Sequence, residues 1–279
     1  MIEIQDLSFT YKNEEKPALR NIRLSVPDGG FLGVIGPAGA GKTTLARAIS
    51  GMIPHHYTGD YYGSVKVNGL DTVETPLADI SRLVGMVFQD IDSQIISPMV
   101  EDELLYGLEN FGVPLEEIPV RIDEALRKVG IADLRERTVG SLSGGQRQKV
   151  AIASIIALRP KILVLDEPTG ELDPRSSRQV FSLLKELNET QGITVIIIEQ
   201  KIMLLCEFAR QLAVLSGGEI FRQGDTRDVL AYAGELQTLG VNCPRVTTLS
   251  RALSEKTGEK QPVCVNLDEA ENMVRRLIP

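Results

Sequence analysis

The sequence predicts an α/β fold, in which a core of parallel strands and helices carries an N-terminal antiparallel β subdomain, an inserted helical subdomain and a small C-terminal α/β tail. Apolar and polar residues alternate over much of the first 70 residues, as they do in half-exposed antiparallel strands. Short, continuous apolar runs occur at residues 31–35, 161–165 and 194–198, a pattern typical of parallel strands covered on both faces. Apolar residues at helical spacing lie between these runs.

The remaining elements follow from spacing and from residues that end helices. Apolar residues at i, i+3 and i+4 predict helices around residues 45–52, 122–129, 150–157 and 180–187. Gly51, Pro160 and Gly192 end three of these helices. Ser216-Gly217-Gly218-Glu219 is predicted to be the turn of a β-hairpin.

Two changes along the chain indicate its domain organisation. Residues from about 90 to 158 are predicted to be mostly helical and to form an insertion. After about residue 235, two short helical stretches surround the polar loop 255–261. We therefore predict one domain over residues 1–235 and a small separate unit over residues 236–279.

Composition and charge exclude several classes of protein. The 279 residues are 43% hydrophobic and 24% charged, which is ordinary for a globular protein. With 38 acidic and 30 basic residues, a net charge of −8 and no basic block, the chain is not expected to bind nucleic acid. No apolar run approaches the roughly 18 residues that cross a bilayer, so any membrane role is expected to be peripheral. The three cysteines have no metal-like spacing and are expected to be reduced thiols in a cytosolic protein.

The sequence GPAGAGKT at residues 36–43 fits the phosphate-binding pattern G-x-x-x-x-G-K-[ST] between a predicted buried strand and a predicted helix. The glycines let backbone N–H groups turn inward around a phosphate, and the helix N-terminus adds its positive end. Lys42 is expected to reach the β and γ phosphates, and the Thr43 hydroxyl to bind Mg²⁺. A glycine-rich turn without a ligand is the alternative. The motif predicts a P-loop NTPase core whose nucleotide-binding residues include Gly36, Gly39, Ala40, Gly41, Lys42, Thr43 and Thr44.

Two acidic residues, Asp166 and Glu167, follow another predicted buried strand. Asp166 is expected to hold Mg²⁺, and Glu167 to orient and deprotonate the attacking water. A pair of acidic residues capping a loop is the alternative. The P-loop weakens that alternative, because bound phosphates need a metal ion and the water needs a base.

The sequence LSGGQ at residues 142–146 precedes a predicted helix, and its serine and two glycines at a helix N-terminus make a second anion site. With the P-loop and the acidic pair, this sequence resembles the ATP-binding cassette (ABC) ATPases over about residues 1–230. In that family the LSGGQ signature of one subunit closes over the γ-phosphate held by the P-loop of a second cassette. The resemblance therefore implies that Ser143, Gly144, Gly145 and Gln146 contact ATP across a dimer of identical or paralogous chains.

The resemblance also implies roles for three residues outside the main motifs. Tyr11 matches the aromatic residue that stacks on adenine, with plain strand packing as the alternative. Gln89 matches the glutamine that contacts Mg²⁺ and water. Asp173 matches an aspartate that communicates across the dimer.

One position departs from the family pattern. Gln200 follows the predicted strand 194–198 where the family normally has a histidine that senses the γ-phosphate. An amide still donates a hydrogen bond, but it carries no charge. A neutral hydrogen bond in place of a charge-assisted one is weaker by about 1–2 kcal/mol. This difference predicts roughly 10-fold slower turnover and a weakened but active site.

The segments 88–96 and 100–114, with the "VED" helix start and the run YGLENFGVP, resemble the cassettes of energy-coupling factor importers of vitamins and metal ions. That resemblance implies a groove for a transmembrane T component, a substrate-binding S component, a location on the cytoplasmic side of the membrane and a C-terminal dimerisation extension. Two other functions stay open. One is a clamp that binds ATP and leaves hydrolysis to its partner; the other is a cassette ATPase acting on ribosomes or DNA.

Overall fold

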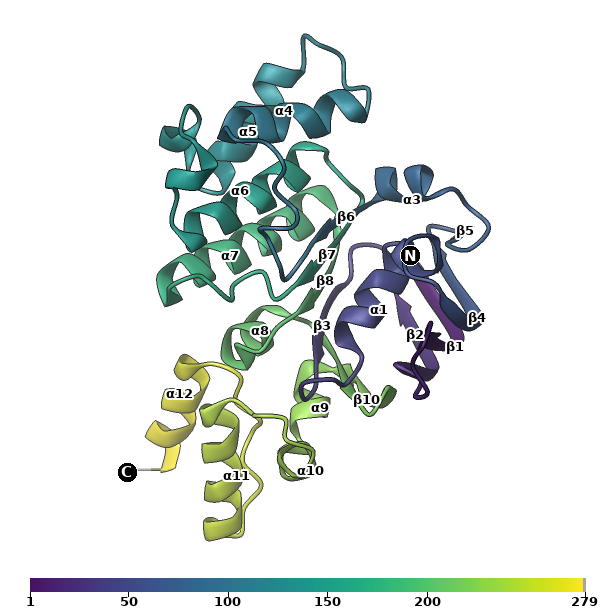
Figure 1. The fold of residues 1–279 in the computed structure, drawn as a ribbon. Helices are drawn as coiled ribbons and strands as arrows, with labels where there is room; N and C mark the ends of the chain where they lie inside the picture. Colours follow the sequence, from purple (N-terminus) through teal and green to yellow (C-terminus); the bar gives the residue numbers. More distant parts are fainter. Residues whose placement is uncertain (278–279) are drawn as a thin grey trace.

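The computed structural model describes residues 1–277, and it contains two β-sheets with helices on both sides of the larger one (Figure 1). The smaller sheet is antiparallel and has the strand order β2-β1-β4-β5. Its strands are β1 (Ile2–Tyr11), β2 (Leu19–Val26), β4 (Gly59–Val67) and β5 (Leu70–Asp71). The alternating pattern of the first 70 residues therefore gives the predicted antiparallel subdomain.

The larger sheet has the order β10-β9-β3-β8-β7-β6 and is parallel except at one edge, where β10 runs antiparallel to β9. Its strands are β3 (Phe31–Ile35), β6 (Val84–Val87), β7 (Ile162–Asp166), β8 (Thr194–Ile198), β9 (Gln211–Ser216) and β10 (Glu219–Asp225). The predicted hairpin is the β9–β10 pair. Because β3, β6, β7 and β8 are parallel, their carboxyl ends lie at the same edge of the sheet.

Both faces of the larger sheet are covered, which explains the continuous apolar runs. Alternate residues of β8 enter different cores: Val195 and Ile197 pack with the helical side, and Ile196 and Ile198 with the antiparallel sheet. Between the two sheets lies α1 (Lys42–Ile49), whose apolar side chains join the second core. Short helices α2 (Met52–His55) and α3 (Leu77–Leu83) follow on this side.

The predicted helical insertion contains α4 (Val100–Asn110), α5 (Ile118–Lys128) and α6 (Gly144–Ala157), with short 3₁₀ turns before α6. Figure 1 shows these helices and α7 (Pro174–Gln191) together on the face of the sheet away from α1. On the same face, α8 (Ile202–Phe208) follows β8. None of the helices in residues 1–277 combines the length and hydrophobicity needed to cross a bilayer.

The C-terminal part contains α9 (Thr226–Leu230), α10 (Ala233–Thr238), α11 (Arg245–Thr257) and α12 (Leu267–Leu277), drawn in yellow-green to yellow in Figure 1. The predicted boundary after residue 235 falls inside α10. Leu236 and Val241 belong to the main core, whereas Val246, Cys264, Ala270 and Met273 form a small core of their own. The boundary between the main core and the small C-terminal core therefore lies between residues 241 and 246.

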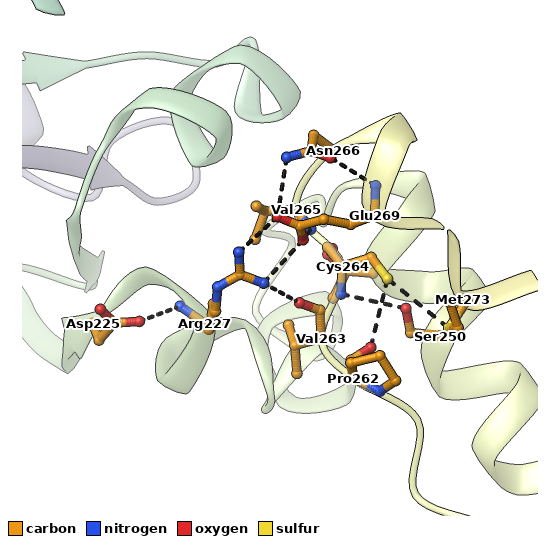
Figure 2. A network of polar contacts seen from close by, with 11 residues as sticks. Asp225, Arg227, Ser250, Pro262, Val263, Cys264, Val265, Asn266, Glu269 and Met273 are labelled. Atoms are coloured by element: carbon orange, nitrogen blue, oxygen red, sulfur yellow. Dashed lines mark hydrogen bonds and ion pairs between the residues drawn. The ribbon is translucent and has the colours of Figure 1, made fainter. Parts of the chain in front are cut away.

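The prediction of an α/β tail is wrong in its β component, since residues 236–277 contain helices and an extended segment but no strand. The backbone N–H groups of Cys264 and Val265 donate to the side chains of Ser250 and Glu269, so they have no need of a neighbouring strand. Arg227 of α9 binds Glu269 and the carbonyl of Val263, and thereby joins this unit to the rest of the chain (Figure 2).

Candidate functional site

Four segments that follow parallel strands meet at the carboxyl edge of the larger sheet. The P-loop follows β3, Gln89 follows β6, Glu167 follows β7 and Gln200 follows β8. Positions separated by more than 160 residues of sequence are therefore neighbours in space, as in other open α/β sheets that bind ligands at this edge.

The P-loop has the conformation that its glycines permit. Gly41 caps α1 with a φ of +98°, and a Cβ at this position would lie 2.5 Å from the carbonyl oxygen of Ala18. Only glycine tolerates this conformation so close to another backbone segment. The loop therefore presents its N–H groups at the start of α1, where the helix dipole favours a phosphate.

Lys42 is the first residue of α1 and is 8% exposed. Its Nζ donates to the carbonyl oxygens of Gly36 and Pro37, each at 2.9 Å. Burial lowers the pKa of Lys42, and the nearby carboxylates of Glu167 and Asp166 oppose that shift. The ammonium group is thus held beside the loop that would enclose the phosphates.

Asp166 ends β7 with a buried carboxylate that is poorly satisfied. The residue is 2% exposed, and its Oδ1 has no hydrogen-bond partner among the described residues. Burial raises the pKa of Asp166, while a hydrogen bond with Thr43 and the charge of Lys42 oppose the shift. No group of three His, Cys, Asp or Glu side chains within residues 1–277 is arranged to hold a metal ion. Mg²⁺ needs fewer protein ligands, because it keeps several waters and also binds phosphate. The unpaired carboxylate oxygen of Asp166, near the Thr43 hydroxyl, therefore fits a Mg²⁺ site.

Glu167 lies between two amide groups. Gln89 donates to its Oε2 at 3.1 Å, and Gln200 donates to its Oε1 at 2.6 Å. The backbone of Glu167 has a φ of +51°, in the left-handed region that is unfavourable for residues other than glycine. Its N–H donates to the carbonyl of Ile198 in β8, and its carbonyl accepts from Gln148 of α6. The loop geometry thus aims the carboxylate toward Gln200.

The two neighbours of Gln200 point into the protein. Glu199 is 3% exposed and accepts hydrogen bonds from the N–H and hydroxyl groups of Thr169. Lys201 donates to the carbonyl oxygens of Thr169 and Leu172 and to the Ser177 hydroxyl. Gln200 itself is exposed, so one of its two N–H donors binds Glu167 and the other faces outward.

The LSGGQ residues form the N-terminus of α6. Ser143 and Gln146 make a capping box: the serine hydroxyl accepts from the Gln146 N–H at 3.3 Å, and the glutamine side chain accepts from the Ser143 N–H at 2.9 Å. Gly144 and Gly145 face the loop after β7, where added Cβ atoms would lie 3.0 Å from Glu171 and 3.1 Å from Leu172. These residues line a cavity of about 440 Å³ together with Asp173.

Tyr11 and Asp173 have structural contacts at the positions where ligand roles are predicted. The Tyr11 hydroxyl contacts Thr44 at 3.1 Å and accepts from Arg47, while its ring packs edge-on against Phe9. Asp173 is exposed and caps α7 by accepting from the N–H groups of Arg175 and Ser176. These contacts do not test the stacking and dimer roles, which stay predictions.

The structure divides the predicted site residues into two groups. Lys42, Asp166, Glu167, Gln89 and Gln200 gather at the sheet edge. By contrast, Ser143–Gln146 and Asp173 line the separate cavity described above. Gln148 was not predicted from the sequence; it is 1% exposed and anchors Glu167 and Glu171. Residues 240–242 were not predicted either; they line a cavity of about 170 Å³ with the P-loop and Gln200. No local signal marks Gln148, because it stands in the polar run QRQK at residues 146–149, and none marks residues 240–242.

Comparisons with known proteins decide the family. The family model described as ABC transporter matches residues 19–170, which is more than half of the chain. The chain belongs to the ABC transporter family. It is 39% identical over 275 residues to a protein of Pyrococcus horikoshii described as an ABC transporter ATP-binding protein, covering 99% of this chain and 96% of that protein. It is also 39% identical over 256 residues to the energy-coupling factor transporter ATP-binding protein EcfA1 of Ligilactobacillus salivarius, covering 92% of this chain and 89% of that protein.

Solved ABC cassettes share the fold. The structure of cbiO1 from Clostridium perfringens, described as part of the ABC transporter complex cbiONQ, has a TM-score of 0.74 at 29% identity, covering 89% of this chain and 97% of that one. The cassette MJ0796, solved as a dimer in a post-hydrolysis state bound to ADP and Pi, has a TM-score of 0.72 at 28% identity, covering 81% and 99%. This ABC cassette is an ATP-binding ATPase with the P-loop α/β fold.

Proposed function

We propose that this cassette binds Mg²⁺ and ATP at the P-loop, hydrolyses the γ-phosphate with Glu167 as general base, and powers an importer of the energy-coupling factor type. The observation that carries the catalytic part is the position of Glu167. Its carboxylate lies between the amides of Gln89 and Gln200, at the same sheet edge as Lys42 and Asp166.

In this proposal each group has one task. The P-loop N–H groups and Lys42 bind the phosphates, and Glu167 takes the proton of the attacking water. Gln200 holds Glu167 with one N–H and offers the other to the γ-phosphate. Asp166, Thr43 and Gln89 would hold Mg²⁺, which neutralises phosphate charge when bound.

A second cassette is part of the proposal. The P-loop and the signature line separate cavities of one chain, and the similar MJ0796 cassette was solved as a dimer. We place the signature residues Ser143–Gln146 and Asp173 against the ATP held by the partner, which is either a copy of this chain or a paralogue. The C-terminal unit with α11 and α12 would add a further contact between the cassettes.

Similarity to EcfA1 and the surface of the helical insertion support the importer branch. Ile96, Tyr106 and Leu115 are 68%, 51% and 76% exposed, so apolar groups are available for helices of a transmembrane T component. We propose that the cassette binds this component peripherally at the cytoplasmic side of the membrane, with a separate S component that binds a vitamin or metal ion.

An alternative function rests on one residue. Gln200 replaces the charged donor expected at its position, which favours an ATP-binding clamp whose partner carries most of the hydrolysis. The ionisable pair Asp166–Glu167 favours a working site. Phosphate release by the purified chain, compared with Glu167→Gln, separates the two functions. A wild-type rate above that of the variant supports hydrolysis at this site, and negligible release by both supports the clamp.

A further inference from the structure

The two polar residues that flank Gln200 both bind the loop between β7 and α7, residues 167–173. Glu199 is buried, and its carboxylate accepts from the N–H of Thr169 at 3.2 Å and from the Thr169 hydroxyl. The same carboxylate accepts from the N–H groups of Gln200 at 2.7 Å and Lys201 at 3.1 Å. One carboxylate therefore joins the end of β8 to the middle of the loop.

Lys201 makes the second connection. Its Nζ donates to the carbonyl oxygens of Thr169 at 2.5 Å and Leu172 at 2.8 Å, and to the hydroxyl of Ser177 at 3.0 Å. Thr169 and Ser177 are fully buried. These contacts use all three donors of the ammonium group, so Lys201 is committed to the loop and to the first turns of α7.

The loop joins the two functional surfaces of the chain. It begins with Glu167, which contacts Gln200, and it ends with Asp173 in the cavity of the signature residues. Leu172, whose carbonyl Lys201 holds, packs against Gly145 of the signature. From the other side, Gln148 of α6 donates to the carbonyl of Glu167 and accepts from the N–H of Glu171.

We propose that Glu199 and Lys201 are positioning residues for hydrolysis, which hold loop 167–173 so that Glu167 stays aligned with Gln200 while the signature surface keeps a fixed place relative to the site. Neither residue needs to touch ATP for this role. A charged group with several loop hydrogen bonds resists rotation of the loop, and misplacement of a reacting group by about 1 Å is enough to slow a reaction about 100-fold. The proposal rests on the proposed role of Glu167 as the base.

The test compares Lys201→Met, which keeps the stem but removes the donors, with Lys201→Arg and with Lys185→Met. Lys185 is an exposed lysine of α7 and serves as the matched control. Lys201→Met should lower kcat about 10-fold and leave KM for ATP within about two-fold of wild type, because the P-loop is unchanged. Hydrogen–deuterium exchange of a peptide spanning residues 167–173 should become faster. Lys201→Arg should recover most of both properties, and Lys185→Met should match wild type.

Exchange is measured without turnover, so it decides the loop contact even where hydrolysis needs a partner. Wild-type exchange of residues 167–173 in Lys201→Met would overturn the proposal. A kcat loss that Lys201→Arg does not recover, with an equal rise in KM and a lower melting temperature, would also overturn it in favour of a purely structural role. Glu199→Gln, which keeps the shape but removes the charge, should show the same pattern as Lys201→Met. Failure of the base assignment is distinct: Glu167→Gln would then hydrolyse ATP at the wild-type rate, whatever the exchange data give.

Discussion

Replacement of Gln200 by histidine should make this cassette faster. Gln200 donates a neutral amide hydrogen to Glu167 at 2.6 Å and has one further donor for phosphate. The acceptor is an anion for either residue, a carboxylate or a phosphate, and a donor that itself carries charge strengthens the hydrogen bond further, by about 1–2 kcal/mol. The difference of about 1–2 kcal/mol predicts that Gln200→His raises kcat about 10-fold. Gln200→Ala removes both donors and should lower kcat about 10-fold, because water replaces them at this exposed position.

The gain should depend on pH, which adds a second readout. Histidine carries charge below its pKa, ordinarily near 6.5, and a neighbouring carboxylate such as Glu167 raises that value. The advantage of Gln200→His over wild type should therefore be full at low pH and decline as pH rises through the histidine pKa. Phosphate release measured from pH 6 to pH 9, with Glu167→Gln as the baseline, checks both the size and the pH dependence.

Two results would refute this reasoning. If Gln200→His is no faster than wild type at any pH, hydrogen-bond strength at this position does not limit hydrolysis. If wild type is as slow as Glu167→Gln, a variant expected to lose about 10²–10⁴-fold, then Gln200 does not support a working site.

Three further predictions concern other parts of the molecule. Burial raises the pKa of Asp166 in the folded protein, so the stability of the nucleotide-free chain should fall as the pH rises from the ordinary pKa of an aspartate through the raised one. Asp166→Asn should remove this loss of stability and therefore melt at a higher temperature than wild type at pH 7. Thermal melts should also show that the variant is no longer stabilised by Mg²⁺ with ATP. Gly41→Ala places a Cβ 2.5 Å from a carbonyl oxygen and should lower the unfolding free energy by about 1–3 kcal/mol in urea titrations, whereas an unchanged midpoint would contradict it. Arg227→Met breaks the partly exposed pair with Glu269, so global stability should fall by about 1 kcal/mol or less while amide exchange in α12 rises; Arg275→Met, whose partner lies within α12, is the control.

The sequence was informative wherever one local pattern decides the structure. Continuous apolar runs predicted β3, β7 and β8, and their parallel arrangement then determines that the residues after each strand meet at one edge. The P-loop, the acidic pair and the signature could be located because each motif stands at a fixed place relative to a strand or a helix.

Contacts between side chains that lie far apart in the sequence could not be predicted from local patterns. Nothing in the pattern around residue 148 indicates that this glutamine reaches Glu167, since the contact depends on the packing of α6 against the loop after β7. Val263 and Val265 alternate as strand residues do. However, Pro262 lacks an N–H group and side chains accept from the N–H groups of Cys264 and Val265, so no strand forms there. Residues 240–242 line the cavity beside the P-loop because of the path of the chain, which no local sequence pattern indicates.

The left-handed backbone of Glu167 has an evolutionary consequence. Glycine, asparagine and aspartate adopt a φ near +51° more readily than glutamate does, but none of them places a carboxylate two methylene groups from the backbone. Under the proposed role of Glu167 as the base, hydrolysis therefore requires at this position a residue that the local conformation disfavours by about 1 kcal/mol. In a lineage in which a paired cassette took over ATP turnover, this position would be released first, and substitution toward glycine or asparagine would raise stability as catalysis was lost.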